Sequence, residues 1–293
     1  MTSAGFVSVV GRPNVGKSTL VNALVGEKVA ITSPRPQTTR NTIRGVATNG
    51  DVQLVLVDTP GLHKPRTALG ERLNMLVAGS IAEADAVLFV LDAGQPIGPG
   101  DRLIAGRLIE AGAPVVVAVN KVDRASSDEI LAQLATAGEW DFAAYVPLSA
   151  LEGDGTDAVR DELEARMPEG PFFFPPDMYT DQPDRLLAAE LVREKYLARL
   201  REELPHSLAV VVDDIEEQEG GALFVAASVY VERRSQKGMV IGKGGELIKR
   251  VGTEARSELE SIFGVKVFLD LRVKVETDWQ RRESTLDRLG FSP

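Results

Sequence analysis

The sequence predicts an α/β domain built on an open, mostly parallel, doubly wound sheet, followed by a smaller α+β domain. Three observations lead to this prediction. Over the first 166 residues, short apolar runs alternate with amphipathic stretches, which is the pattern of strands and crossover helices. A proline-rich segment then interrupts this rhythm, and the elements beyond it follow in a different order. A chain of 293 residues is long enough for two such domains.

The strands expected in the first domain are apolar on both faces, as in a parallel sheet with helices on its two sides. They are Phe6–Val10, Val52–Val57, Ala86–Leu91, Val115–Val119 and Ala144–Pro147. Helical patterns lie between them, near residues 17–25, 68–81, 100–110, 126–138 and 155–166. In a sheet of this kind, ligands bind in the loops at the carboxyl ends of the strands.

Residues 167–184 contain five prolines and almost no periodicity, which indicates a linker. We therefore divide the chain into a first domain over 1–170, a linker over 171–184 and a second domain over 185–293; a surface loop within one domain is the alternative. The elements expected in the second domain are a helix over about 184–203, strands Ser207–Asp213 and Ala222–Glu232 around the turn Gly220-Gly221, a glycine-rich loop, a helix over about 245–262, a strand Lys266–Val275 and a terminal helix within Trp279–Arg288.

Composition and charge restrict the classes of function. The chain has no cysteine, which excludes a disulfide framework, a thiol nucleophile and a thiolate metal site. It has no apolar stretch near the roughly 18 residues of a membrane helix and no basic region of a secretory signal, so we expect a cytoplasmic protein. The net charge is −10, and residues 1–170 (15 basic, 21 acidic) and 171–293 (18 basic, 22 acidic) are both acidic. Nucleic-acid binding would therefore require a local basic patch.

The segment Gly11–Ser18 matches the phosphate-binding pattern G-x-x-x-x-G-K-S/T. It follows a predicted strand and opens a predicted helix, which favours this interpretation over a simple glycine-containing turn. The glycines let backbone N–H groups converge on phosphate oxygens, and the helix adds its positive end. We expect Lys17 to place its charge near the β- and γ-phosphates and Ser18 to offer its hydroxyl to Mg²⁺.

Three further motifs at strand ends indicate that the nucleotide is GTP or GDP. In Asp58-Thr59-Pro60-Gly61, which alone would read as a capped turn, the acid can hold Mg²⁺ through water and the glycine N–H can approach a γ-phosphate. In Asn120-Lys121-Val122-Asp123, the last carboxylate can accept two hydrogen bonds from guanine that adenine cannot donate, while Asn120 and Lys121 buttress the ring and the loop. Ser149-Ala150-Leu151 can offer a backbone N–H to the guanine oxygen.

The candidate residues of this site can now be collected. The predicted GTP-binding residues are Gly11, Arg12, Pro13, Asn14, Val15, Gly16, Lys17, Ser18, Thr19, Asp58, Thr59, Pro60, Gly61, Leu62, Asn120, Lys121, Asp123, Ser149, Ala150 and Leu151.

A basic patch lies in the second domain. Residues 233–256 contain seven basic and two acidic residues, a local charge of +5 in an acidic protein. They surround Ile241-Gly242-Lys243-Gly244-Gly245, a G-x-x-G loop between two helical stretches, which in KH domains clamps about four nucleotides beside an apolar groove. The predicted RNA-binding residues are Arg234, Lys237, Ile241, Gly242, Lys243, Gly244, Gly245, Lys249 and Arg250. The alternatives are a solvated basic helix face or a second phosphate loop.

An acidic run, Asp213–Glu219, precedes the predicted turn between the first two strands of this domain. The simplest interpretation is a solvated hairpin tip. A second is that the run repels RNA from the wrong face of the domain.

These motifs together resemble the Era family of bacterial GTPases. The resemblance covers nearly the whole chain: it includes the phosphate loop, Gln37–Arg40, Asp58–Leu62 and Asn-Lys-x-Asp, the linker 175–183, and residues 236–245 with their continuation 252–256. It implies an α/β P-loop GTPase domain followed by an α+β type II KH domain. It also implies binding near the 3′ end of 16S rRNA, a role in assembly of the 30S ribosomal subunit, and partial peripheral association with the membrane. We expect a monomer.

The same resemblance assigns the mobile parts of the GTPase. The segment Pro36–Arg40 lies where such proteins keep their first switch, and it implies that Thr39 rather than Thr38 closes on Mg²⁺ when a γ-phosphate is present. The metal ligands would be Ser18, Thr39 and Asp58. The catalytic residues would be Lys17, Asn14, Thr39 and Gly61.

The residue after Gly61 bears on how GTP is hydrolysed. It is Leu62, which cannot orient water as the glutamine of many GTPases does, so hydrolysis must depend on electrostatic positioning or on other groups. Asn14 is one such group, because the matching asparagine of similar GTPases can bind K⁺; the alternative is that it only shapes the loop. We interpret His63 as a solvated loop residue rather than a general base.

These inferences predict a switch, in which GTP and Mg²⁺ order the segments around Thr39 and Asp58–Gly61 and so control how the KH domain presents its groove. One rival is a constitutive RNA-binding protein whose nucleotide site only stabilises the fold. Another is a tRNA-modification GTPase, which the lack of a cysteine or an obvious cofactor domain disfavours.

Overall fold

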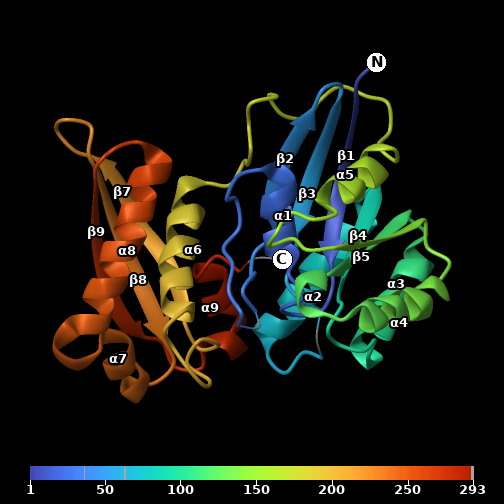
Figure 1. The fold of residues 1–293 in the computed structure, drawn as a ribbon. Coiled ribbons are helices and arrows are strands. Elements are labelled where there is room, and N and C mark those ends of the chain that lie inside the picture. Colours follow the sequence, from blue (N-terminus) through green and yellow to red (C-terminus); the bar gives the residue numbers. More distant parts are fainter. Residues whose placement is uncertain (36, 63, 292–293) are drawn as a thin grey trace.

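The computed structural model describes residues 1–35, 37–62 and 64–291. Its first domain contains a six-stranded sheet with the order β2-β3-β1-β4-β5-β6, in which every neighbouring pair is parallel except β2 and β3 (Figure 1). The strands are β1 (Ser3–Val10), β2 (Ile43–Asn49), β3 (Val52–Asp58), β4 (Ala86–Asp92), β5 (Val115–Asn120) and β6 (Ala144–Leu148).

Helices cover both faces of this sheet. One apolar cluster joins it to α1 (Lys17–Val25) and α5 (Thr156–Glu164), and a separate cluster joins its other face to α2 (Ala68–Ala82), α3 (Pro99–Ala111) and α4 (Ser127–Gly138). All seven residues of β4 are buried, which explains why the central strands lack alternation of apolar and polar residues. The predicted doubly wound fold is confirmed. A short 3-10 turn, η1 (Val122–Arg124), follows β5.

Strand β2 was not predicted from the sequence. Its residues include Arg44, Gly45 and Thr48, which interrupt the apolar pattern, because it is an edge strand that pairs antiparallel with β3. Gly45 is required by packing: a Cβ atom there would lie 2.7 Å from a methyl group of Val25. Helix α1 can therefore approach this edge of the sheet closely.

The proline-rich linker lies along the same edge rather than hanging free. The Val46 N–H donates to Tyr179 O at 2.8 Å, and Gly45 and Thr180 form an isolated antiparallel bridge. The fully buried Gln53 side chain accepts hydrogen bonds from the N–H groups of Phe173 (2.9 Å) and Phe174 (3.0 Å) and donates to Phe174 O (2.9 Å). The linker is thus fixed to the first domain over most of its length.

The second domain contains a three-stranded sheet with the order β7-β8-β9, in which β7 and β8 are antiparallel and β8 and β9 are parallel. Its elements are α6 (Asp184–Leu197), β7 (Ala209–Glu217), β8 (Leu223–Val231), α7 (Arg234–Ile241), η2 (Lys243–Gly245), α8 (Glu246–Phe263), β9 (Val267–Val275), η3 (Trp279–Arg281) and α9 (Glu283–Arg288). The order helix, strand, strand, helix, helix, strand is the one predicted for a type II KH domain, and this part of the fold class is confirmed.

Helix α6 is shorter than predicted. It ends at Leu197, whereas the sequence pattern suggested about residue 203. The chain turns after Ala198 so that Leu200 and Leu204 can both enter the core that α6 shares with β8 and α8. Tertiary packing overrides local helix propensity here.

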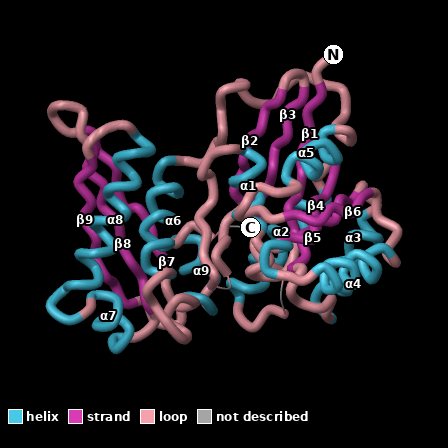
Figure 2. The backbone as a smooth tube through the Cα atoms, in the orientation of Figure 1, coloured by secondary structure: helices cyan, strands magenta, loops and turns pink. Residues whose placement is uncertain are grey.

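The two domains meet across the loop between α1 and β2, which the structure describes over residues 26–35 and 37–42. Figure 1 shows this segment in blue, running between α6 and the first domain, and Figure 2 shows it as a loop. Helix α2 makes a second contact, because Leu69 and Leu73 share an apolar cluster with Trp279, Leu286 and other residues of the second domain. Within the described part of the chain, no helix is both long and apolar enough to cross a lipid bilayer.

Candidate functional site

The phosphate loop connects β1 to α1 at the carboxyl end of the sheet. Two of its glycines have backbone conformations that favour glycine: Gly11 has φ 152° and Gly16 has φ 101°. A Cβ atom at Gly11 would lie 2.5 Å from Val90 O, and one at Gly16 would lie 2.2 Å from the Asn120 side chain. The loop therefore holds its curled shape through residues that only glycine can supply.

Lys17 lies beneath this loop, where its ammonium group donates to Gly11 O (3.3 Å) and Arg12 O (3.1 Å). Burial lowers the pKa of Lys17 to about 8, and the nearby Asp58 carboxylate only partly offsets this effect. A buried cation of this kind is stabilised by an anion, such as a phosphate group, in the adjacent loop.

Three side-chain oxygens meet at the start of α1. Ser18 donates to Asp58 Oδ2 at 2.6 Å, Thr39 donates to the same oxygen at 3.1 Å, and the two hydroxyl oxygens are 3.0 Å apart. The other carboxylate oxygen of Asp58 is buried and has no hydrogen-bond partner among the described residues. Burial raises the pKa of Asp58. Hard oxygen ligands with one unsatisfied carboxylate oxygen fit Mg²⁺, either directly or through water.

Thr38, the alternative to Thr39, lies outside this group. Its hydroxyl donates to Arg35 O at 2.7 Å, within its own loop. Of the two neighbouring threonines, the one selected in the sequence analysis is therefore the one that reaches Ser18 and Asp58.

The segment after β3 lies directly against the phosphate loop. The Thr59 hydroxyl donates to Val9 O at 2.7 Å, and a Cβ atom at Gly61 would lie 2.6 Å from Pro13 N. The Leu62 N–H donates to Gly11 O at 3.3 Å, while its side chain is buried in the cluster beneath α2. Leu62 thus serves packing. The predictions for Pro36 and His63 lie outside the described residues.

The base-side loops are held together by Asn120 and Lys121. The Asn120 side chain donates to Val15 O (2.9 Å) and accepts from the Ala150 N–H (2.9 Å), so it links three loops. Lys121 donates to Asn14 O (2.6 Å) and pairs with Asp92 (2.7 Å). Ser149-Ala150-Leu151 was predicted to offer a backbone N–H to the guanine oxygen, and in this structure the Ala150 N–H of that segment is engaged with Asn120.

Asp123 lines a cavity of about 370 Å³, together with residues that include Asn14, Gly16 and Leu151. It accepts a hydrogen bond from the Ser149 hydroxyl at 2.6 Å, and this bond is the main reason that its pKa is lowered. The structure therefore brings Asn120, Lys121, Asp123, Ala150 and Leu151 around one space, and the lowered pKa keeps the Asp123 carboxylate ionised.

Two predicted loop residues make contacts that the motif did not indicate. The Arg12 side chain pairs with Asp101 of α3 at 2.8 Å. Asn14, in a left-handed conformation with φ 65°, donates from its side chain to Pro34 O at 2.9 Å. Asn14 thus connects the phosphate loop to the loop between α1 and β2, two residues before the first switch segment.

The sequence analysis missed a pair of buried arginines between the domains. Arg40 is 1% exposed and donates to Leu208 O (2.6 Å), His206 O (2.9 Å) and Pro205 O (3.2 Å). Arg193 of α6 donates to Thr38 O from the other side. The two residues flanking Thr39 are therefore both bound to the second domain. Arg40 belongs to the Gln-Thr-Thr-Arg pattern, but nothing in that pattern indicates where its side chain lies.

Charged side chains reinforce both interdomain contacts. Lys28 pairs with Glu194 (2.8 Å) and Glu258 (2.6 Å) beside the first switch segment. On α2, which follows the Asp58–Gly61 motif, Arg72 pairs with Asp287 at 2.5 Å and donates to Phe291 O at 2.8 Å. The first switch segment and helix α2 therefore both lie in contact with the second domain.

The glycine-rich loop of the second domain lies between α7 and α8, as predicted. Gly242, Gly244 and Gly245 all have positive φ values, of 79°, 61° and 80°. A Cβ atom at Gly244 or Gly245 would meet no atom within 4 Å, so the backbone there is open to a ligand. Lys243 and the neighbouring Lys249 are exposed. Ile241, by contrast, is half-buried and packs on the core of the domain.

A groove of about 440 Å³ lies between α8 and β9 and begins at Ile248 and Lys249, in the first turn of the helix that follows this loop. Ile248, Gly252 and Leu271 form part of its apolar lining, and Arg256 lies on its wall. Phe268 of β9 also lines it and is 59% exposed. Arg256 and Phe268 were not among the predicted RNA-binding residues; an aromatic residue at an outward position of the last strand was the available signal.

The acidic run lies at the end of β7 and in the turn that follows, where Glu216 pairs across the two strands with Phe224, a residue that also lines this groove. Its first two residues are engaged: Asp213 accepts from Ser228, and Asp214 pairs with Arg185 at 2.8 Å. Residues 216–219 are exposed, as expected for a solvated hairpin tip.

A P-loop nucleotide site with a guanine-type Asn-Lys-x-Asp motif, joined to a KH domain, defines an RNA-binding class of GTPase. Comparisons with known proteins agree. A family model described as "50S ribosome-binding GTPase" matches residues 6–121, and one described as "KH domain" matches residues 203–280. The chain is 52% identical over 295 residues to GTPase Era of Mycobacterium tuberculosis (strain H37Rv) and to GTPase Era of Mycobacterium avium (strain 104), covering 98% of both chains in each case.

Two solved structures match the whole chain. Aquifex aeolicus Era, in a variant bound to GDP and AlF4⁻, is 38% identical with a TM-score of 0.96, and 100% of each chain is covered. Era in complex with MgGDPNP and nucleotides 1506–1542 of 16S ribosomal RNA gives the same identity, TM-score and coverage. The chain belongs to the Era family of GTPases.

Proposed function

We propose that this GTPase binds the 3′ end of 16S rRNA through its KH groove, acts in assembly of the 30S ribosomal subunit, and uses its nucleotide state to control RNA binding. The RNA assignment is supported by the family and by the relative whose structure contains 16S rRNA nucleotides. The control is supported by one observation above all: Thr39 reaches Ser18 and Asp58, while both of its neighbours are bound to the second domain.

In this proposal, the phosphate loop binds the triphosphate through its N–H groups and Lys17. Ser18, Thr39 and Asp58 would hold Mg²⁺, and the ion would supply positive charge that offsets the negative charge of the phosphates. The Gly61 N–H approaches the γ-phosphate from the loop after β3. Since the Leu62 side chain is buried and has no hydrogen-bonding group, no side chain at that position orients the attacking water. We therefore expect slow intrinsic hydrolysis that depends on electrostatic positioning.

Asp123 selects guanine in this scheme, and Asn120 and Lys121 hold the three loops around the base. The proposed RNA contacts begin at the glycine-rich loop, where Lys243 and Lys249 face the phosphate backbone and the glycines admit it closely. Bases would enter the apolar groove between α8 and β9, with Phe268 available for stacking.

Coupling between the nucleotide site and the RNA-binding domain follows from the position of the first switch segment. With GTP bound, Thr39 would stay beside Ser18 and Asp58, Arg40 would keep its three acceptors in the second domain, and Arg193 would keep its bond to Thr38 O. Release of Thr39 after hydrolysis loosens both contacts, because the three residues are consecutive. A segment with two states of this kind can transmit the nucleotide state to the second domain, because its contacts with that domain differ between the two states.

The test is to measure affinity for an RNA spanning nucleotides 1506–1542 of 16S rRNA, with MgGDPNP and with GDP. We expect the two affinities to differ by about fivefold or more, a usual size for coupling between sites. Arg40→Lys, which keeps the charge but cannot reach three carbonyl groups, should bring the ratio close to one. Arg160→Lys, on an exposed pair in α5, is the matched control. Equal affinities in the unsubstituted protein would favour a constitutive RNA-binding protein.

Further features of the proposal rest on the family resemblance and on Asn14. We include K⁺ bound at Asn14, whose side-chain nitrogen donates to Pro34 O, so that its oxygen is the atom suited to a cation. We also include a monomeric, cytoplasmic protein with partial peripheral membrane association. Sedimentation velocity tests whether the protein is a monomer. Fractionation of cells with immunodetection tests its cytoplasmic location and its association with the membrane.

A further inference from the structure

Trp279 lies in the contact between the two domains. It follows β9 in residues 279–291, which we call the α9 segment, and its side chain is fully buried. The indole N–H donates to Ser207 O at 3.0 Å, and the ring stacks on Phe291 with 5.6 Å between the ring centroids and 16° between the ring planes. Arg40 of the first domain lies over the indole, with its Cζ atom 5.9 Å from the ring centroid. A guanidinium at this distance is attracted by the negative face of the ring.

Trp279 and Arg40 bind the same short loop of the second domain. Arg40 donates to three carbonyl groups of the loop 205–208, and the indole N–H binds the remaining one, that of Ser207. Arg40 Nε is buried and has no hydrogen-bond partner among the described residues, so the guanidinium depends on the indole ring as well as on its acceptors. Trp279 thus fixes Arg40 twice, through the loop that receives it and through the ring against which it lies.

The α9 segment also contacts α2, the helix that follows the Asp58–Gly61 motif. Leu69 and Leu73, in the first two turns of α2, share the apolar cluster of Trp279. Between them, Arg72 donates to a backbone oxygen of the α9 segment at 2.8 Å and pairs with one of its carboxylates at 2.5 Å. The α9 segment therefore lies against the first switch segment and against helix α2.

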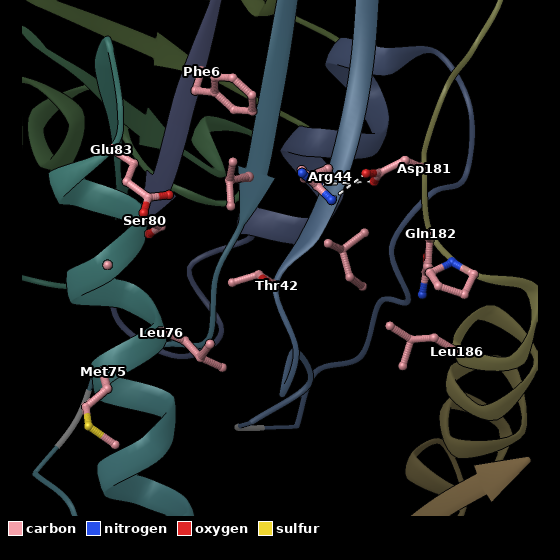
Figure 3. A pocket seen from close by; sticks show the side chains of 14 residues that line it. Phe6, Thr42, Arg44, Met75, Leu76, Ser80, Glu83, Asp181, Gln182 and Leu186 are labelled. Carbon is pink, nitrogen blue, oxygen red and sulfur yellow. Dashed lines mark hydrogen bonds and ion pairs between the residues drawn. The ribbon is translucent and has the colours of Figure 1, made fainter. Parts of the chain in front are cut away.

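A cavity separates the end of α2 from the linker and from α6. Its volume is about 510 Å³, and Figure 3 shows Ser80 and Glu83 on one side of it, with Gln182 and Leu186 on the other. Packed side chains transmit a displacement, whereas a cavity does not. A movement of α2 therefore reaches the second domain through the first turns of the helix, which pack on the α9 segment.

We propose that Trp279 is a positioning residue of the GTPase switch: it holds Arg40, and through it Thr39, in the arrangement that favours GTP over GDP. Thr39 reaches Ser18 and Asp58 and is the residue before Arg40. Release of Thr39 from that position therefore moves the guanidinium that lies over the indole ring. The inference rests on the proposed control of RNA binding and names the segment that carries it, because β9, at the edge of the RNA groove, leads directly into the α9 segment.

Fluorescence of Trp279 tests the proposal directly. The chain has two tryptophans, and the other, Trp140, packs against Phe89 and Phe142 within the first domain. Trp140→Phe in the full chain therefore leaves Trp279 as the one indole. We expect its emission to differ between the complexes with MgGDPNP and with GDP, because the charge of Arg40 near the ring alters the energy of the emission. Equal emission in the two complexes would overturn the proposal.

The RNA affinities of the same two complexes separate this inference from the proposed function. If the affinities differ and the emission does not, the nucleotide controls RNA binding by another route, and only the role of Trp279 fails. If the emission differs and the affinities are equal, Trp279 keeps its role at the switch, and the control of RNA binding fails.

Substitutions of Trp279 distinguish a positioning role from a structural one. Trp279→Leu should weaken MgGDPNP binding about tenfold and leave GDP binding nearly unchanged, because only the GTP-bound arrangement requires Thr39 to be held. Trp279→Phe keeps an aromatic face for Arg40 and should recover part of that loss. Fluorescent-nucleotide competition measures both affinities.

Val251→Ala is the control for these variants, since it removes side-chain volume from a separate core cluster of the second domain. It should weaken the binding of neither nucleotide. Thermal melting verifies that each variant is folded. Equal losses of MgGDPNP and GDP binding in Trp279→Leu, or the same loss of MgGDPNP binding in Val251→Ala, would show a structural role alone and would contradict the proposal.

Discussion

At the scale of single residues, the side chains of the proposed nucleotide site come from loops that meet at one edge of the first sheet. Each motif combines a residue type with a fixed spacing. The fold brings Lys17, Asp58 and Asp123 to the same edge of the sheet, because all three lie at or just beyond the carboxyl ends of strands. Arg40 and Arg193 were not predicted, because their roles depend on carbonyl groups that only the folded chain brings near. Local patterns do not encode such distant partners.

The carboxylate of Asp123 leads to the first prediction. Asp123→Asn should lower GTP affinity about 100-fold and raise the relative affinity for XTP, because an amide replaces one acceptor with a donor and no longer matches guanine. Competition binding with fluorescent nucleotides measures both. Ser149→Ala, which removes only the hydroxyl that holds Asp123, is the control and should cause a smaller loss without a preference for XTP. Unchanged selectivity in Asp123→Asn would remove Asp123 from its proposed role.

A second prediction concerns Asn14. Intrinsic GTP hydrolysis should be about tenfold faster in K⁺ than in Na⁺, since a correctly sized cation can offset charge that develops between the phosphates. Asn14→Gly should abolish this difference while leaving the loop intact, because glycine tolerates the φ of 65° found there. Phosphate release at matched ionic strength provides the measurement. Equal rates in the two salts would mean that Asn14 only shapes the loop.

At the scale of elements, the buried strands of the first sheet were predicted closely, because burial on two faces leaves an unmistakable apolar run. The edge strand β2 was missed, since one glycine and several polar residues conceal it. The end of α6 was placed too late for a related reason: side chains of Leu200 and Leu204 enter the core from a turn rather than from a continued helix. Elements shaped mainly by tertiary packing were the ones that the sequence predicted poorly.

The loop between α7 and α8 allows a prediction with an internal control. Replacing Gly244 and Gly245 with aspartate should reduce RNA affinity by about 100-fold or more, because two carboxylates would face the phosphate backbone. GTP affinity should stay near its normal value. The same replacement at Gly220 and Gly221, a pair with positive φ in the β7–β8 turn, introduces similar strain and charge elsewhere in the domain. If both pairs reduced RNA binding equally, the glycine-rich loop would have no special role.

At the scale of the whole molecule, the interface between the domains combines a buried core with an ion cluster. Lys28 and Lys195 both pair with Glu194 and Glu258. Burial by itself would raise the pKa of Glu194. Hydrogen bonds from Lys195 and Lys28 outweigh this effect and hold the pKa of Glu194 below the ordinary value of 4.5. The pKa of Glu258 is lowered for the same reasons. A carboxylate with a depressed pKa stabilises the folded state above pH 4.5, and this contribution disappears as the pH falls below that value.

This cluster predicts a pH-dependent effect of Lys28→Ala. At neutral pH the substitution should destabilise the protein by about 1 kcal/mol, as expected for a partly exposed network. The difference from the unsubstituted protein should shrink as the pH falls below 4.5, because the glutamates then lose their charge, and it should also shrink in high salt. Thermal unfolding measures the difference. Asp157→Asn, which breaks an exposed pair on α5, should have little effect at any pH. A Lys28→Ala effect independent of pH and salt would contradict this account.

The linker sets how the two domains can move. Tyr179 and Thr180 are bonded to β2, Asp181 is paired with Arg44, and α6 begins at Asp184. Only residues 182 and 183 lie between these anchors. Any reorientation of the second domain that leaves these contacts in place must therefore be a rotation about a hinge at residues 182 and 183. The glycine-rich loop, far out along the second domain, would sweep a wide arc, so that a small rotation at the pivot becomes a large displacement at the RNA.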